Sequence, residues 1–393
     1  MPLTAPWSKK HKAVTNASSG GLPYSLSNSY AQPLTMPELA AFTEARGDRA
    51  LLDEYRGHAL GYTPNGGSLD LRSAIAGMYG PGITPAHVLV FAGAQVALQT
   101  ASLALATGCH AIVFAPGYQS TVAAPGHAGA EVTEIRLRAD KGWQIDPAEV
   151  EAAVRPGETR YMVINEPYNP AGTLMSREVQ AALVAIAKKH GITLMSDEVY
   201  RLLEHDEADR LPAMADAYER GISAVTMSKP WGGCGITIGW LAFADLAVKQ
   251  RLVDVQYFGT ACPGRATELQ AMMVLRASDA ILAKNLAIIR RNVEKLREFM
   301  NKYEEYFAWV PPRAGAVAFL KFKGGLTSEQ LGQEMAAAGI GMKPAYCFTP
   351  EVTDDVDFFR VGYGEEVMPE ALDKFAEFVE ANKHRWQIKD RSR

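Results

Sequence analysis

The sequence has few cysteines and no pattern that suggests a metal or disulfide framework. Only four of its 393 residues are cysteine, and they are scattered over positions 109, 234, 262 and 347 without a Cys-x-x-Cys pair. This distribution argues against paired disulfides and against a zinc site, so we expect four reduced, mostly buried thiols. The eight histidines are equally dispersed, and no metal site is expected.

Long apolar runs and an excess of one charge are also lacking. The 40 basic and 44 acidic side chains give a net charge of −4 without blocks of one sign, so no nucleic-acid partner is expected. The longest apolar stretches, such as 103–106 and 181–187, fall well short of the roughly 18 residues that span a bilayer, so no membrane partner is expected. The first twenty residues contain lysines but no apolar run, which predicts a cytoplasmic protein without a secretory signal.

What is present is ordinary globular composition, 48% apolar and 21% charged, over a length that predicts two or three domains. Between residues 85 and 245 short apolar runs alternate with segments of helical period, the clearest at 94–107 and 176–190. The predicted strands are 87–92, 111–115, 131–137, 160–165, 192–196 and 224–228. Because these runs are apolar on both faces, the fold class is α/β, with a mostly parallel sheet covered by helices on both faces.

The rest of the chain predicts a smaller α+β domain after one long helix. The expected elements are helices at 37–46, 266–303, 328–338 and 369–383 and strands at 314–323 and 358–362. We therefore expect an N-terminal arm and helix (1–50), a large domain (51–265), an interdomain helix (266–303) and a small C-terminal domain (304–393). The glycine-rich segment 233–239 is not a dinucleotide site, because its third glycine is displaced and a predicted strand, not a helix, follows it.

Polar residues follow three of the predicted strands. Asn169 lies in an Asn-Pro-Ala-Gly segment, Asp197 and Tyr200 form an Asp-x-x-Tyr pair, and Lys229 follows Ser228. In an open α/β sheet the carboxyl ends of the strands form the ligand-binding edge, so these side chains are expected to converge on one crevice.

These motifs are individually weak, but in their order and spacing the chain, from about Tyr62 to Arg360, resembles the fold-type I pyridoxal-phosphate enzymes, specifically the class I/II aminotransferase family. The resemblance implies a pyridoxal 5′-phosphate cofactor and transfer of an amino group from an α-amino acid to a 2-oxo acid by a homodimer with shared active sites. It implies that Lys229 forms the Schiff base and then moves a proton between Cα and C4′. The alternative interpretation is that Lys229 is a lysine on the protein surface.

The same resemblance implies roles for the neighbouring residues. Asp197 would keep the pyridine nitrogen protonated, and Asn169 and Tyr200 would hydrogen-bond the phenolic oxygen of the cofactor. The alternative for Asp197 is that it caps a helix, and the alternative for Asn169 and Tyr200 is a role in a turn or in the core. The ring would stack on Tyr118, which could otherwise belong to the core.

The phosphate and the substrate would be held by residues from distant segments. The turn Gly93-Ala94-Gln95 before a helix would cradle the phosphate with backbone N–H groups, although such a turn is often only structural. The remaining implied ligands are the hydroxyls of Thr226 and Ser228, Tyr62 from the partner subunit, and Arg360 with Asn169 for the substrate.

One position departs from the family pattern. Where the family has an arginine that clamps the phosphate, this chain has Thr237. Arg265 from the partner subunit is a candidate replacement, or else a solvated residue that opens the long helix. The departure leaves open a second hypothesis, a pyridoxal-phosphate lyase, cyclase or oxidase acting on an amino acid. Its substrate would be cationic if Glu166 faced the pocket, but a solvent-facing loop acid is the alternative for Glu166. A non-catalytic binding module has no need of Lys229 together with Asp197.

Overall fold

A seven-stranded sheet forms the centre of the computed structural model, which describes residues 22–260 and 262–386. The strand order is β2-β8-β7-β6-β5-β3-β4. The bounds are β2 (Val88–Phe91), β3 (His110–Ala115), β4 (Glu131–Arg136), β5 (Thr159–Asn165), β6 (Thr193–Asp197), β7 (Gly221–Thr226) and β8 (Gly239–Phe243). All neighbours are parallel except those of β8, which runs antiparallel to both β2 and β7.

Helices cover both faces of this sheet because its strands are apolar on both sides. Along β5, Tyr161 and Val163 pack with α5 (Ala94–Leu105) and α11 (Lys249–Gly259). The alternate residues Met162 and Ile164 pack on the opposite face with α9 (Arg177–His190). This alternation confirms the predicted fold class, with helices on each face of a mostly parallel sheet.

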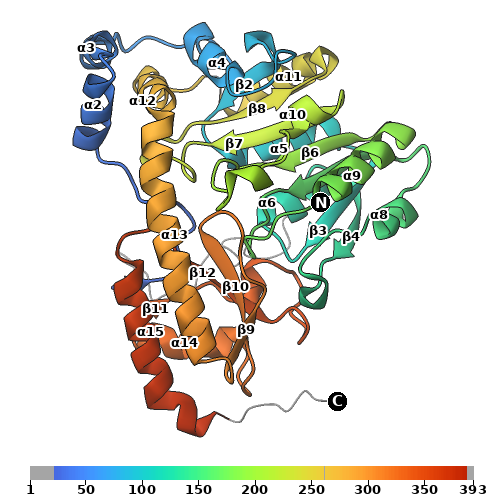
Figure 1. The fold of residues 1–393 in the computed structure, drawn as a ribbon. Helices are drawn as coiled ribbons and strands as arrows, with labels where there is room; N and C mark the ends of the chain where they lie inside the picture. The colour runs from blue at the N-terminus through green and yellow to red at the C-terminus, as the bar shows by residue number, and fades with distance from the viewer. Residues whose placement is uncertain (1–21, 261, 387–393) are drawn as a thin grey trace.

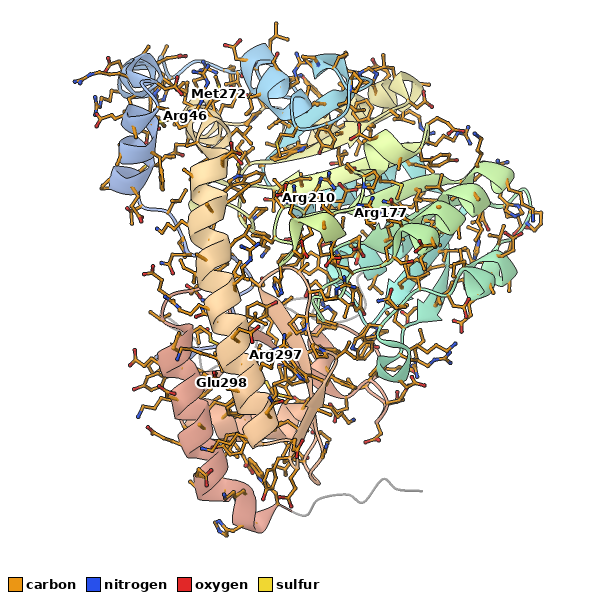
Figure 2. The ribbon with its side chains drawn as sticks, viewed as in Figure 1. Arg46, Arg177, Arg210, Met272, Arg297 and Glu298 are labelled. Atoms are coloured by element: carbon orange, nitrogen blue, oxygen red, sulfur yellow. The ribbon has the colours of Figure 1, made fainter. Side chains whose placement is uncertain are left out.

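A smaller antiparallel sheet, ordered β12-β10-β9, lies at the other end of α13 (Ser278–Lys302). Figure 1 shows α13 running from the large sheet to the small one, and Figure 2 labels Arg297 and Glu298 on its lower part, beside the small sheet. The elements of this region are β9 (Phe307–Trp309), β10 (Val317–Phe322), β12 (Phe358–Gly362), α14 (Ser328–Ala337) and α15 (Met368–Asn382). A short strand β1 (Tyr24–Ser25) pairs in parallel with β11 (Ile340–Gly341).

The remaining helices lie around the large sheet. They are α2 (Met36–Ala45), α3 (Arg49–Gly57), α4 (Leu69–Ala76), α6 (Gln119–Val122), α7 (Ala124–His127), α8 (Pro147–Ala153), α10 (Met214–Ala217) and α12 (Arg265–Arg276). In the part of the chain that the structure describes, no helix has the length and apolar character needed to cross a membrane.

Several predicted elements differ in their bounds from those in the structure, and two of the differences affect the description of the site. The continuous helix expected over 266–303 is interrupted at Ala277, which separates α12 from α13. The indole of Trp231 donates a hydrogen bond to the hydroxyl of Ser278 at 2.8 Å, so a tertiary contact from another segment accompanies the break. The strand expected at 224–228 ends at Thr226, which leaves Lys229 in the following loop. The domain boundaries stay a prediction.

Candidate active site

The carboxyl ends of β5, β6 and β7 open into a cavity of about 360 Å³, a volume typical of small-molecule sites. The cavity lies between the two sheets, since Arg360 comes from β12 and Asp197 from β6. The predicted site residues that line it are Gly93, Ala94, Gln95, Tyr118, Asn169, Asp197, Thr226, Ser228, Lys229 and Arg360. The structure thus brings together residues that are widely separated in sequence.

Lys229 projects into this cavity from the loop after β7. Its Nζ donates a hydrogen bond to Oγ of Ser29 at 2.9 Å. Desolvation of the amine, with a smaller effect of the Arg360 charge, lowers the pKa of Lys229 to about 8, because both disfavour the ammonium form. A larger fraction of the amine is therefore neutral, and hence nucleophilic, near neutral pH than for a solvated lysine.

Asp197 is a buried carboxyl at the end of β6. One of its oxygens accepts a hydrogen bond from the amide of Val199 at 3.3 Å. Burial raises the pKa of Asp197 to about 7, although the nearby Lys229 charge acts in the opposite direction. A carboxyl desolvated in this way is stabilised as the anion by a cationic partner, which a protonated pyridine nitrogen would provide.

Arg360 is buried and lines the cavity from β12. Its guanidinium donates to Oδ1 of Asn169 at 3.1 Å and to the carbonyl of Ser27 at 2.9 Å. Within the described residues, its buried Nε has no hydrogen-bond partner, which is costly. A charged guanidinium on the cavity wall suits a carboxylate ligand.

The start of α5 offers a phosphate cradle. Gly93, at the N-cap with φ +89°, provides no side chain to cap the first-turn N–H groups. A Cβ on Gly239 would lie 2.4 Å from the amide nitrogen of Ala94, so β8 can approach the helix start only because residue 239 is glycine. The hydroxyls of Thr226 and Ser228 lie 3.3 Å apart on the same cavity wall. In the structure the Thr226 hydroxyl donates to the carbonyl of Ile238 at 3.1 Å. The N–H groups of the first helical turn, with the neighbouring hydroxyls, fit a phosphate dianion.

Three residues predicted to contact the cofactor, Tyr200, Tyr62 and Arg265, do not line this cavity within the single chain. The Tyr200 hydroxyl donates to the carbonyl of Ser29 at 2.9 Å, so its contact with a cofactor oxygen stays a prediction. Tyr62 is 99% exposed. Arg265 pairs with Glu54 and, at 3.1 Å, with Glu268. For Tyr62 and Arg265 the predicted role is in the partner's site, and it also stays a prediction.

Thr237 lines the cavity at the end of a short 3₁₀ turn, Cys234–Ile236. Its φ of +54° is an unusual, strained value for a β-branched residue. Its side chain is uncharged, so the position provides no phosphate-clamping cation.

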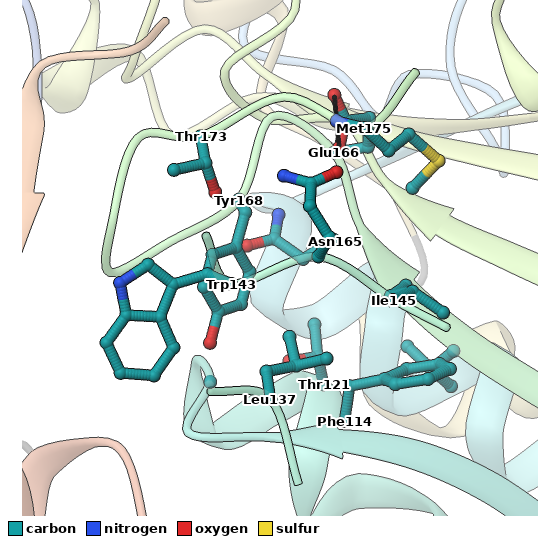
Figure 3. A pocket seen from close by; sticks show the side chains of 13 residues that line it. Phe114, Thr121, Leu137, Trp143, Ile145, Asn165, Glu166, Tyr168, Thr173 and Met175 are labelled. Carbon is teal, nitrogen blue, oxygen red and sulfur yellow. Dashed lines mark hydrogen bonds between the residues drawn. The ribbon is translucent and has the colours of Figure 1, made fainter. Parts of the chain in front are cut away.

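The solvent-facing position suggested for Glu166 is wrong. Its side chain is buried, and its carboxylate accepts from the amide of Met175 at 3.1 and 3.2 Å. It lines a separate cavity of about 20 Å³ with Asn165 and Tyr168 (Figure 3), which is large enough for one water molecule. Burial raises the pKa of Glu166 well above its usual range. Because Glu166 lies in that other cavity, it does not support selection of a cationic substrate.

The sequence provided no local signal for several further lining residues. Lys343 neighbours Arg360 through a β-bridge, with backbone hydrogen bonds of 3.0 and 2.7 Å. Burial, followed by the Arg360 charge, lowers the pKa of Lys343 to about 8. The other lining residues that the sequence analysis did not assign to the site include Ser29, Cys234, Cys347 and Phe348. These residues reach the cavity through β-bridge pairing and through the way the chain folds in three dimensions. No sequence motif marks them.

A lysine, a buried carboxyl and a helix N-terminus around one cavity define the class of protein, a pyridoxal-phosphate enzyme of fold type I. The model of the family "Aminotransferase class I and II" matches residues 32–379. The chain belongs to this family, and it is a pyridoxal-phosphate-dependent aminotransferase.

Individual relatives agree with this membership. An aspartate aminotransferase from Thermotoga maritima is 28% identical, over 81% of this chain and 83% of that protein. Capreomycidine synthase from Streptomyces vinaceus is 27% identical, over 76% of this chain and 75% of that protein. The crystal structure of a PLP-dependent aminotransferase from Streptococcus suis superposes with a TM-score of 0.84 at 26% identity, covering 92% and 94% of the two chains.

Proposed function

We propose that this protein transfers the amino group of an α-amino acid to a 2-oxo acid at a site centred on Lys229. The observation that carries the proposal is the convergence of Lys229, Asp197 and Arg360 on one cavity. When bound, pyridoxal phosphate supplies the carbon that accepts the amino group and a ring that withdraws electrons from the substrate Cα.

Each residue has a distinct task in this proposal. Arg360 binds the substrate α-carboxylate, and its contact with Asn169 holds the guanidinium in place. The pKa of Lys229 is about 8, so near neutral pH its Nζ can take a proton from the substrate Cα and deliver it to C4′ of the cofactor. Asp197 keeps the ring nitrogen protonated, and the N-terminus of α5 with Thr226 and Ser228 holds the phosphate.

We also propose that the enzyme is a homodimer in the cytoplasm. Leu60 and Tyr62 are 96% and 99% exposed, and Phe258 is 89% exposed. Leu60 and Tyr62 lie in the loop after α3, and Phe258 lies in the last turn of α11. The segments that follow these residues meet where the Thr63 hydroxyl donates to the carbonyl of Pro263 at 2.5 Å. Exposed large apolar side chains on adjoining segments favour a protein interface, from which Tyr62 would reach the partner's site. The cytoplasmic location is inferred from the sequence alone.

Supplying one substrate at a time tests the proposed reaction. The purified enzyme would be mixed with each member of a panel of α-amino acids while the absorbance of the cofactor is followed. With the correct donor alone, we expect the cofactor to convert once to its amine form and turnover to stop. Addition of a 2-oxo acid is expected to restart turnover. Continued consumption of the donor without any 2-oxo acid would contradict the proposal.

A second candidate is a lyase, cyclase or oxidase that acts on an amino acid at the same site. Two observations support this candidate: Thr237 replaces the family's phosphate-clamping arginine, and one relative is named a synthase, capreomycidine synthase, and not an aminotransferase. Such an enzyme needs no 2-oxo acid. It would keep consuming the donor in the experiment above, and an oxidase would also consume dioxygen.

The departure at Thr237 leads to a prediction about cofactor affinity. Arg265→Ala is expected to weaken cofactor binding by about ten- to a hundredfold, because one charge-assisted hydrogen bond to the phosphate would be lost. Thr237→Arg in that background should recover part of the loss, since the Thr237 side chain is exposed at the cavity. Cofactor release during dialysis measures both effects.

The control for this prediction is Arg276→Ala, because Arg276 is on the same helix and also forms an ion pair, at 3.2 Å with Asp48. It should leave cofactor release unchanged. If Arg265→Ala also releases cofactor at the wild-type rate, Arg265 has no part in the phosphate site.

A further inference from the structure

Residues 24–34 form a strap that passes between the Lys229 loop and β12. At its start β1 pairs with β11, and the carbonyl of Leu26 accepts from the amide of Gly362 at 2.6 Å. Further along, the amide of Ala31 donates to the carbonyl of Lys229 at 3.1 Å. The strap is therefore hydrogen-bonded to both walls of the active-site cavity.

Three glycines allow the strap to pass this closely. A Cβ on Gly362 would lie 1.7 Å from the carbonyl oxygen of Asn28, and one on Gly364 would lie 2.0 Å from that of Tyr30. On the other side, a Cβ on Gly232 would lie 1.9 Å from the carbonyl oxygen of Gln32. All three distances are far below van der Waals contact, so the path of the strap depends on glycine at these positions.

At its centre the strap touches three residues of the active site. The hydroxyl of Ser29 accepts from Nζ of Lys229, and its carbonyl accepts from the hydroxyl of Tyr200, each at 2.9 Å. The carbonyl of Ser27 accepts from the Arg360 guanidinium at 2.9 Å. Of these contacts, only the one to Lys229 uses a side chain of the strap.

We propose that Ser29 is a positioning residue for Lys229: its hydroxyl holds Nζ in one place within the cavity whenever the amine is not joined to the cofactor. This inference rests on the proposed function, in which the substrate amine displaces Lys229 in every cycle. A lysine has a long, flexible stem, and a fixed acceptor limits the positions that the released amine can occupy. The acceptor is uncharged, so it orients Nζ without the strong preference for the ammonium form that a carboxylate would impose.

The neighbouring groups agree with a positioning role. The ring of Tyr30 lies 5.9 Å from Nζ of Lys229, so a second residue of the strap bounds the amine. Among the charged and titratable groups nearby, Arg360 lowers the pKa of Lys229, whereas Cys234 and Asp197 raise it. The Ser29 hydroxyl adds a direct, directional contact at the lysine amine.

Reactivity of Lys229 in the cofactor-free enzyme tests the proposal. The enzyme would be labelled with an amine reagent across a range of pH, and the peptide that carries Lys229 quantified by mass spectrometry. Loss of the Ser29 acceptor removes a contact that favours the ammonium form, so for Ser29→Ala we expect the labelling midpoint to move below that of the wild type. We expect cofactor reloading to slow by about three- to tenfold, as for loss of one hydrogen bond.

Three variants serve as comparisons. Ser29→Thr keeps the hydroxyl and should restore both readouts, whereas Ser29→Cys, with a weaker acceptor of similar size, should change them in the direction of Ser29→Ala. The matched control is Ser27→Ala, because the Ser27 hydroxyl pairs with that of Ser25 at 2.9 Å and its carbonyl is unaffected. It should match the wild type.

A labelling profile of Lys229 that is the same in Ser29→Ala and Ser29→Cys as in the wild type would overturn the proposal. The labelling needs neither substrate nor turnover. A shifted profile in an enzyme that fails to transfer amino groups would therefore uphold the Ser29–Lys229 contact and reject the proposed reaction.

Discussion

Lys229→Ala is expected to lower turnover by more than about a thousandfold, because the variant loses both the nucleophilic amine and the group that moves the proton. The phosphate cradle at Gly93 and the carboxyl of Asp197 are unchanged, so the protein should still bind the cofactor noncovalently. Steady-state rates measure the first effect. Borohydride reduction followed by mass spectrometry measures the second, since no cofactor should become attached to the variant.

Lys343→Ala is the matched control, because Lys343 lines the same cavity and its pKa is also lowered to about 8. In this control, reduction should still attach cofactor to Lys229. Cofactor attached to Lys343 in the Lys229→Ala protein would show that the lysines had been assigned the wrong way round.

Asp197→Ala is expected to reduce the rate by about a hundred- to a thousandfold while weakening cofactor binding much less. In the proposed reaction its carboxylate would keep the ring nitrogen of the cofactor protonated, and this interaction would matter most when electrons move into the ring in the transition state. The turnover number and the cofactor dissociation constant, determined separately for wild type and variant, distinguish the two effects.

Glu198→Gln provides the comparison for Asp197. Glu198 is the next residue and is also buried, but it accepts hydrogen bonds from the amide of Met214 and the hydroxyl of Ser223 and does not line the cavity. Its substitution should affect the rate far less than substitution of Asp197. Near-native turnover of Asp197→Ala would mean that this carboxyl only caps the following turn.

The sheet and the centre of the site could be predicted because their signals are local. A short stretch of sequence is enough to recognise a strand that is apolar on both faces, and such strands indicate a parallel sheet. Polar residues that follow these strands then lie together at the carboxyl edge of the sheet. Asn169, Asp197 and Lys229 follow β5, end β6 and follow β7, respectively. Their convergence therefore follows from strand order alone.

The contacts of Ser29, Lys343 and Glu166 could not be predicted, because they depend on how separate segments pack together. Ser29 reaches Lys229 because three glycines admit the strap, and Lys343 reaches the cavity because it is paired with Arg360. Glu166 turns inward to meet the amide of Met175, although a loop carboxylate is usually solvated. Glu166 and Met175 are only nine residues apart, but no motif marks their contact, and the other pairs lie farther apart in the sequence.

The reversed strand β8 also constrains synthesis of the protein on the ribosome. In the described part of the chain β2 pairs with β8 alone, and β2 leads directly into Gly93 at the start of α5. A nascent chain that has not yet reached residue 243 therefore lacks the strand that anchors its phosphate cradle. Pairing β2 with a strand so far along the chain is slow relative to forming local contacts, so the cofactor would be captured only after synthesis has passed residue 243 of the 393.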